Sequence, residues 1–127
     1  MTDRQLLNLA KIAAENAHAP YSRFTVGAAL ECSNGKVFTG CNIENAALSN
    51  TICAERVAVF KAVSEGIKDF KRLAIYGPGK TYCLPCGACR QVLCEFSDNL
   101  ELLCSNELGN YVSHRLRDLL PHAFSFK

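Results

Sequence analysis

Three of the eight cysteines stand in two short motifs that are typical of metal sites. Cys53 opens the sequence Cys-Ala-Glu, and Cys86 and Cys89 form a Cys-x-x-Cys pair after Pro85. Eight cysteines in 127 residues is a high number for a cytosolic chain, where disulfides are rare, so some are expected to bind a metal or to react. Zinc takes four protein ligands in a structural site, but three and a water in a catalytic one. Three cysteines therefore match an open zinc site.

Glu55 is the residue that favours catalysis over a purely structural role. It stands two residues after Cys53, and a carboxylate beside an open coordination position could exchange protons with the water there. The Cys-Ala-Glu element combined with Pro-Cys-x-x-Cys resembles the zinc deaminase signature, with Cys53 in place of the first His. The pair of motifs predicts a hydrolytic zinc centre.

Cys83 leaves the ligand set open. A lone Cys-x-x-Cys is equally compatible with a structural zinc knuckle or a redox pair. Cys83 precedes Cys86 by three residues, so these two could be the ligand pair, or all four cysteines could close a structural site. We favour Cys86 with Cys89, because only this register puts Pro85 before the first ligand and both ligands on the first turn of a helix. The other cysteines are expected to be small buried hydrophobes: Cys32, Cys41, Cys83, Cys94 and Cys104.

Two helices are expected to begin beside these cysteines, over residues 53–65 and 86–96. N-cap candidates precede the first of them, Gly66 ends it, and Pro85 suits the start of the second. The unpaired N–H groups and the positive dipole end of a helix favour a thiolate, which is the form that binds zinc. Both helix starts therefore suit the ligands that they would carry.

The remaining pattern predicts a sheet covered by helices. Capping-box spacing at Thr2 and Gln5 begins a first helix that runs to about Ala17. A strand containing Gly27, whose missing Cβ suits a close contact, is followed by an Asn-Gly turn that predicts an antiparallel hairpin. The expected strands cover residues 24–31, 37–42, 72–76, 100–105 and 111–113, and a last helical turn covers 116–120. Alternating strands and helices predict an α/β fold.

Composition limits the class of protein. The length and the 49% hydrophobic content fit one domain over residues 1–127. The net charge of +2, with both signs interspersed, predicts no nucleic-acid or anionic-membrane partner. The apolar stretches are too short to span a membrane, and the N-terminal residues lack a secretory signal pattern. We expect a soluble cytoplasmic protein.

The motifs together carry a family resemblance over almost the whole chain. The sequence resembles the small cytidine deaminases, and specifically their three-cysteine, homotetrameric type. This resemblance implies a single-domain α/β/α sandwich with a central mixed sheet of about five strands. The stretches that carry it are residues 24–29, 40–46, 53–56, 85–91 and 119–124.

The resemblance implies hydrolytic deamination of cytidine and deoxycytidine to the uridine nucleosides and ammonia, in pyrimidine salvage. One zinc per chain would be held by Cys53, Cys86 and Cys89, and Glu55 would carry protons between water, ring N3 and the leaving ammonia. Three thiolates on Zn²⁺ leave one negative charge, which weakens the metal as a Lewis acid. We expect Arg56 to donate to ligand sulfurs and withdraw part of that charge.

The resemblance also assigns the substrate contacts, with a free pyrimidine nucleoside as the partner. Asn42 and Glu44 match the pair that binds the sugar hydroxyls, and Phe24 stands where an aromatic residue lies against the nucleoside. The backbone around Ala54 would read the base edge. Phe124 matches a residue supplied by a neighbouring subunit, so the sites would be shared within a homotetramer.

Three other functions remain as alternatives. A relative acting on a blasticidin-type nucleoside is disfavoured by the sugar-binding match at Asn42 and Glu44. A nucleic-acid editor needs a basic, aromatic-lined track that this chain lacks, and a non-catalytic zinc module has no need of Glu55. Leu48 replaces a common tyrosine, and Leu84 replaces a small polar residue that often precedes Pro85. These two departures concern the interface and substrate affinity and leave the reaction in place.

Overall fold

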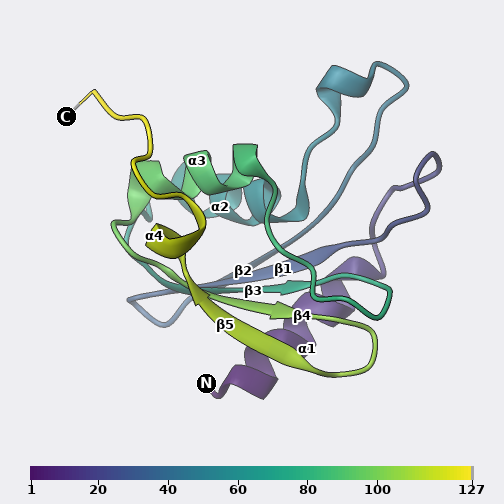
Figure 1. The fold of residues 1–127 in the computed structure, drawn as a ribbon, viewed down its shortest axis with the longest axis horizontal. Coiled ribbons are helices and arrows are strands. Elements are labelled where there is room, and N and C mark those ends of the chain that lie inside the picture. The colour runs from purple at the N-terminus through teal and green to yellow at the C-terminus, as the bar shows by residue number, and fades with distance from the viewer. Residues whose placement is uncertain (127) are drawn as a thin grey trace.

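The computed structural model describes residues 1–126, which form five strands, four α-helices and one 3₁₀ helix (Figure 1). Over this range no helix is both long and apolar enough to cross a membrane. The elements in chain order are α1 (Asp3–Ala14), β1 (Gly27–Cys32), β2 (Val37–Cys41), η1 (Leu48–Asn50), α2 (Ala54–Ser64), β3 (Phe70–Tyr76), α3 (Gly87–Phe96), β4 (Glu101–Ser105), β5 (Tyr111–Arg115) and α4 (Leu116–Leu119).

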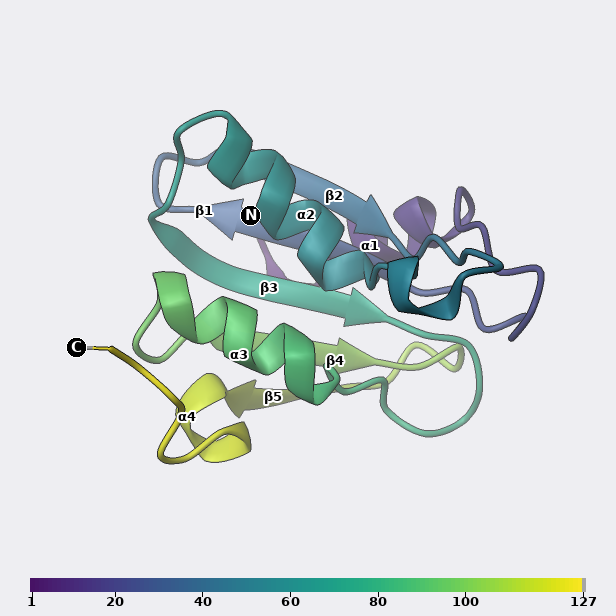
Figure 2. The same ribbon diagram turned by 90° about the horizontal axis from the view of Figure 1, so that it is seen from above.

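The strands form one mixed sheet in the order β2-β1-β3-β4-β5. Only β3 and β4 are parallel, and α3 provides the crossover between them, whereas the other neighbours are antiparallel. Helices α2 and α3 lie side by side over one face, and α1 covers the other (Figures 1 and 2). The predicted α/β/α sandwich with a mixed five-stranded sheet is confirmed.

Hydrophobic side chains fill both faces of the sheet. The larger cluster lies between the sheet and helices α2 and α3, and the smaller one lies between the sheet and α1. All six residues of β1 are buried, as expected of a strand covered on both faces. The sheet is therefore a rigid base for the N-terminal ends of α2 and α3.

Several predicted boundaries need correction. Strand β3 begins at Phe70 rather than at Arg72, and β5 ends at Arg115 rather than at Ser113. The capping box between Thr2 and Gln5 is confirmed, but α1 ends at Ala14 rather than near Ala17. The first strand begins at Gly27 rather than at residue 24. In the stretch before Gly27, the Val26 amide and the Phe24 carbonyl oxygen bond to the side chain of Asn42 rather than to the backbone of a neighbouring strand. These residues therefore do not form a regular strand, although their sequence is apolar.

Two glycines allow helices to approach the sheet closely. A Cβ at Gly27 would lie 1.8 Å from the carbonyl oxygen of Ala10 in α1, so the close contact predicted from the sequence is confirmed. A Cβ at Gly40 in β2 would lie 2.4 Å from the carbonyl oxygen of Ala54. Both distances are far below van der Waals contact. Gly40 thus lets the first turn of α2 rest directly on the sheet.

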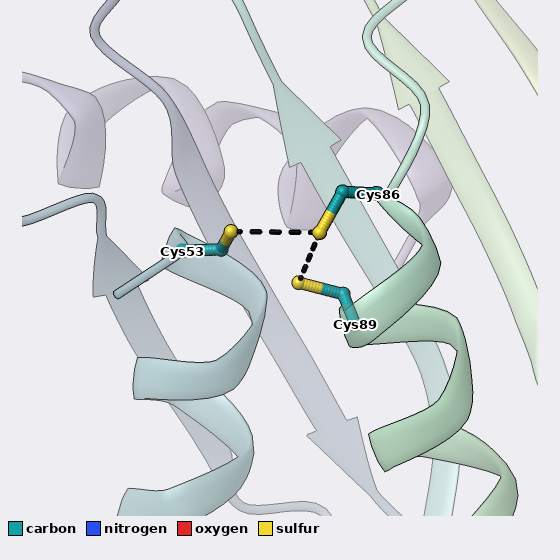
Figure 3. Close-up of side chains that lie close together, drawn as sticks. All are labelled: Cys53, Cys86 and Cys89. Carbon is teal, nitrogen blue, oxygen red and sulfur yellow. Dashed lines mark hydrogen bonds between the residues drawn. The ribbon is translucent and has the colours of Figure 1, made fainter. Parts of the chain in front are cut away.

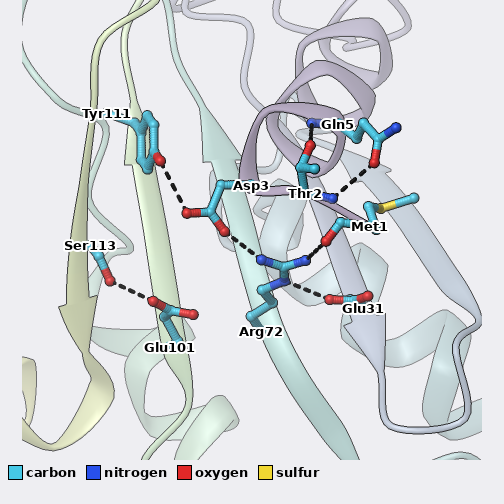
Figure 4. Close-up of polar contacts among 9 residues, drawn as sticks. All are labelled: Met1, Thr2, Asp3, Gln5, Glu31, Arg72, Glu101, Tyr111 and Ser113. Atoms are coloured by element: carbon cyan, nitrogen blue, oxygen red, sulfur yellow. Dashed lines mark hydrogen bonds and ion pairs between the residues drawn. The ribbon is translucent and has the colours of Figure 1, made fainter.

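A buried arginine joins α1 to three strands (Figure 4). The Nε of Arg72 in β3 donates to Glu31 Oε1 of β1 at 2.5 Å, and its two terminal nitrogens donate to Asp3 and to the Met1 carbonyl oxygen. Asp3 also accepts from the Tyr111 hydroxyl of β5 at 3.0 Å. This network lies on the face of the sheet opposite the cysteine motifs.

Candidate active site

The structure brings together the three cysteines that the motifs singled out (Figure 3). Cys53 is the N-cap of α2, Cys86 is the N-cap of α3, and Cys89 lies in the first turn of α3. Their sulfur atoms all lie within 4.8 Å of one another, with Cys53 and Cys86 at 3.7 Å and Cys86 and Cys89 at 3.5 Å. Within residues 1–126 this is the one cluster of His, Cys, Asp or Glu side chains compact enough to hold a metal ion. Three converging sulfurs fit a tetrahedral zinc site with one position open.

The surroundings of the cluster favour thiolates. Cys53 and Cys86 are the N-caps of α2 and α3, where the positive end of each helix dipole favours a thiolate. Hydrogen bonds from Cys89, Arg56 and Cys86 lower the pKa of Cys53 to about 5. The same hydrogen bond raises the pKa of Cys89, because Cys89 is the donor to Cys53. These hydrogen bonds favour ionisation of Cys53, and a thiolate is the form of cysteine that binds zinc.

Arg56 lies against the cluster as the sequence suggested. Its Nη2 donates to Cys53 Sγ at 3.3 Å, and this hydrogen bond raises the pKa of the guanidinium. Among the residues described, the Nε of Arg56 is the one buried side-chain nitrogen or oxygen without a hydrogen-bond partner. A guanidinium committed to a ligand sulfur in this way withdraws charge from it.

Glu55 is buried immediately beside the sulfurs. It lies in the first turn of α2, and only 4% of its surface is exposed. Burial raises the pKa of Glu55 to about 7, against the opposing effect of a backbone hydrogen bond. A carboxyl group that titrates near neutrality can both accept and release a proton at physiological pH, which is the property of a general acid–base catalyst.

A cleft of about 220 Å³ opens onto this centre. Its walls contain two of the clustered cysteines, Glu55 and the predicted substrate residues Phe24, Asn42 and Ala54. Leu84 also lines the cleft, so the departure at this position faces the candidate binding site. Leu48 is 73% exposed on η1, outside the cleft.

Asn42 lines the cleft and Glu44 does not, and both side chains make contacts that the sequence did not predict. Strand β2 ends at Cys41, so the expected alternation along a strand end does not apply. Their side chains instead hold the segment that carries Phe24: Asn42 Nδ2 donates to the Phe24 carbonyl oxygen at 2.7 Å, and Glu44 Oε1 accepts from the Tyr21 amide at 2.9 Å. No motif in the sequence signals these contacts, because they join loops that are distant along the chain.

Cys83 and Phe124 take different places from the cluster. Cys83 lines the cleft wall rather than joining the three sulfurs, and burial raises its pKa to about 12. Phe124 lies in the C-terminal tail beside α3, where its carbonyl oxygen accepts from Gln91 Nε2 at 3.0 Å. Its side chain is 67% exposed. The structure therefore does not bring Phe124 into the cleft of its own chain.

Comparison with known proteins agrees with this geometry. Residues 1–102 match the family model of the cytidine and deoxycytidylate deaminase zinc-binding region. The chain belongs to the cytidine and deoxycytidylate deaminase family. A cytidine deaminase from Sporosarcina psychrophila is 46% identical over 126 residues, covering 98% of this chain and 93% of the relative.

Two solved structures give the same result for the fold. A cytidine deaminase from Burkholderia pseudomallei is 46% identical with a TM-score of 0.94, covering 98% of this chain and all of the other. A cytidine deaminase from Mycobacterium tuberculosis is 40% identical with a TM-score of 0.84, covering 99% of this chain and all of the other. The chain is thus a member of a family of zinc-dependent hydrolases, and its cysteine cluster fits a three-cysteine zinc site.

Proposed function

We propose that this chain is a zinc-dependent cytidine deaminase that converts cytidine and deoxycytidine to the uridine nucleosides and ammonia. The observation that carries the proposal is the cleft itself, in which buried Glu55 and two of the three clustered cysteines face the same space. The relatives that match nearly the whole chain are named cytidine deaminases, which supports this choice of substrate.

Cys53, Cys86 and Cys89 are the residues that would hold zinc. When bound, zinc supplies Lewis-acid activation of a water molecule at neutral pH. The two helix N-termini and the Arg56 guanidinium offset the charge of three thiolates. These groups keep the ligands ionised and limit the loss of Lewis acidity that three thiolates would otherwise cause.

Glu55 moves the protons of the reaction. It takes a proton from the attacking water and delivers it to ring N3, while the hydroxyl oxygen forms a bond to C4. It then takes the hydroxyl proton and transfers it to the amino group, so that the C4–N4 bond breaks, C4 becomes a carbonyl and ammonia leaves. A pKa of about 7 allows Glu55 to perform both transfers without a large thermodynamic cost in either direction.

The remaining predicted residues orient the nucleoside. Phe24 and the Ala54 backbone lie in the cleft wall beside the zinc ligands, where they would contact the base. Asn42 lines the cleft and Glu44 holds the residues just before Phe24; these two side chains would bind the sugar hydroxyls. A free nucleoside offers a base and a sugar to these two groups of residues and needs no track for a nucleic-acid strand.

Glu55→Gln provides the direct test. The amide cannot accept the proton, so we expect zinc content and fold to be kept while kcat for cytidine falls by roughly 10²–10⁴-fold. The measurements are ammonia release, loss of cytidine absorbance with and without a zinc chelator, and zinc per chain. Turnover near that of the wild type in zinc-replete Glu55→Gln would remove Glu55 from the mechanism.

A substrate panel separates the remaining alternatives. Cytidine, deoxycytidine and a blasticidin-type nucleoside are assayed side by side for ammonia release. Turnover of the blasticidin-type compound alone would assign the chain to a different substrate. Zinc binding without turnover of any nucleoside would favour a structural zinc module.

We further propose a homotetramer in which Phe124 completes the cleft of a neighbouring subunit. The support is that Phe124 is exposed, lies beside α3 and does not line the cleft of its own chain. Closed assemblies of identical chains are common. Phe124→Ala and Glu55→Ala should each impair activity, and co-refolding the two variants should give more activity than their sum. Mixed oligomers without such recovery would show that Phe124 does not act in a neighbouring site.

Residues 1–127 would form one catalytic domain that acts in pyrimidine salvage. None of the eight cysteines forms a disulfide in the structure, and such cysteines are typical of proteins of the reducing cytoplasm. We therefore place the reaction there.

A further inference from the structure

Phe24 follows a backbone turn of unusual conformation. Arg23 has a φ of +61°, in the left-handed region that residues with a Cβ rarely adopt. Its amide donates to the Ala19 carbonyl oxygen at 3.0 Å, and its own side chain is exposed. The conformation of Arg23 is therefore imposed by its neighbours, and unfavourable backbone conformations that are held in this way concentrate at functional sites.

Glu44 holds the residues before the turn. Its Oε1 accepts from the amides of Tyr21 and Ser22 at 2.9 and 3.1 Å, and hydrogen bonding to Ser22 lowers the pKa of Glu44. The carboxylate thus stays ionised and fixes two consecutive amides. A charged acceptor makes stronger hydrogen bonds than a neutral one, so this contact resists opening of the turn.

Asn42 holds the residues after the turn. Its Nδ2 donates to the Phe24 carbonyl oxygen at 2.7 Å, while its Oδ1 accepts from the Val26 amide at 2.9 Å. The Phe24 amide donates to Ser22 Oγ at 3.0 Å. Both backbone groups of Phe24 are therefore bonded, and Arg23 lies between two anchored segments.

These contacts matter because packing alone does not hold the Phe24 ring. Phe24 is 44% exposed while it lines the cleft. The direction of a half-exposed ring depends mainly on the backbone that carries it. A change in φ at Arg23 would turn the following residue away from the cleft.

We propose that the left-handed turn at Arg23, held by Glu44 and Asn42, is a positioning device that preforms the aromatic wall of the nucleoside cleft. Arg23 acts through Phe24 and touches no reacting atom, so it is a positioning residue. The inference rests on the proposed function, because it takes Phe24, Asn42 and Glu44 as substrate contacts. It adds that the two sugar-binding side chains also build the wall against the base.

Both side chains retain capacity for the sugar. A carboxylate can accept about four hydrogen bonds, and an amide NH₂ group carries two donors. Glu44 accepts from the amides of Tyr21 and Ser22 and from the Ser22 side chain, which leaves room for a further donor, and Asn42 uses one donor on Phe24. Substrate binding and loop anchoring are thus compatible.

Arg23→Val and Arg23→Asn form a matched pair for the test. Both remove the same charge, but asparagine tolerates the left-handed region, whereas branched valine does not. We expect Arg23→Asn to keep KM and kcat for cytidine within about twofold of the wild type. Arg23→Val should raise KM roughly tenfold with kcat nearly unchanged, because the wall contacts ground state and transition state alike.

Hydrogen exchange of the amides of residues 21–26 gives a second readout in the absence of nucleoside. Exchange should be faster in Arg23→Val than in Arg23→Asn or the wild type. Equal KM and equal exchange in the two variants would overturn the proposal, as would a loss of kcat with KM unchanged. Absence of deamination by the wild type would instead refute the proposed function, while the exchange comparison would still test the turn.

Ser22 provides a second route if Arg23→Val does not fold, which thermal unfolding and zinc content would reveal. Ser22→Ala removes the acceptor of the Phe24 amide, whereas Ser22→Thr keeps a hydroxyl. We expect a several-fold higher KM and faster exchange in Ser22→Ala, with Ser22→Thr close to the wild type. Identical behaviour of these two variants would also contradict the positioning role.

Discussion

The buried network around Arg72 gives a sharp prediction for stability. The side chains of Arg72 and Glu31 are only 10% and 7% exposed, and the Arg72 Nε lies 2.5 Å from Glu31 Oε1. Replacing Arg72 by methionine leaves the Glu31 carboxylate buried without its partner. Removal of one member of a buried ion pair typically costs about 3–5 kcal/mol. Asp3 adds little to this loss, because its side chain is 36% exposed and can be hydrated.

The assay is thermal unfolding of Arg72→Met at saturating zinc and fixed protein concentration, since binding and assembly shift apparent stability. For a chain of this length the predicted loss corresponds to a fall in Tm of at least about 10 °C. Lys71→Met is the matched control, because Lys71 is the exposed neighbour on the same strand and loses the same charge. Its Tm should change by only a degree or two, because surface charges contribute little.

A double variant tests the physical reason. Arg72→Met combined with Glu31→Met removes both charges and should recover much of the lost stability, because well-packed apolar side chains can replace a buried ion pair at little cost. The kcat of folded Arg72→Met should match the wild type, since the network lies on the opposite face of the sheet from the cysteines. A fall in Tm no larger than that of Lys71→Met, or no recovery in the double variant, would refute the reasoning.

Further predictions concern the metal centre and the packing of α1. Cys83→Ser should keep about one zinc per chain by elemental analysis, whereas Cys86→Ser should lose it. Of these two cysteines, Cys86 belongs to the sulfur cluster and Cys83 does not. X-ray absorption should report three sulfurs and one light atom, and four sulfurs would contradict this ligand set. Gly27→Ala should lower the Tm markedly, because its Cβ would lie 1.8 Å from the Ala10 carbonyl oxygen. Gly87→Ala meets open space and is the control.

The amino-acid sequence was sufficient for the candidate chemistry because local pattern carries that information. The spacing of Cys86 and Cys89, with Pro85 before them, predicts two ligands on one helical turn, and the structure places both there. The separation of Cys53 and Glu55 likewise predicts a carboxylate in the first turn of a helix. Helix starts, hairpin turns and the alternation of strands and helices are also short-range signals. The fold class followed from them.

Only the tertiary structure decided how these local pieces meet. The ligand role of Cys83 stayed open in the sequence, and the three-dimensional arrangement excludes it from the cluster because its chain position places it on the cleft wall. The bonds of Asn42 and Glu44 to the segment before β1 join residues about 20 positions apart. They take the place of strand pairing over residues 24–26, the first part of the strand that the apolar pattern predicted. Local propensity cannot encode such pairs. They form because the hairpin and the loop after α1 are brought to the same edge of the sheet, where unpaired backbone groups need partners.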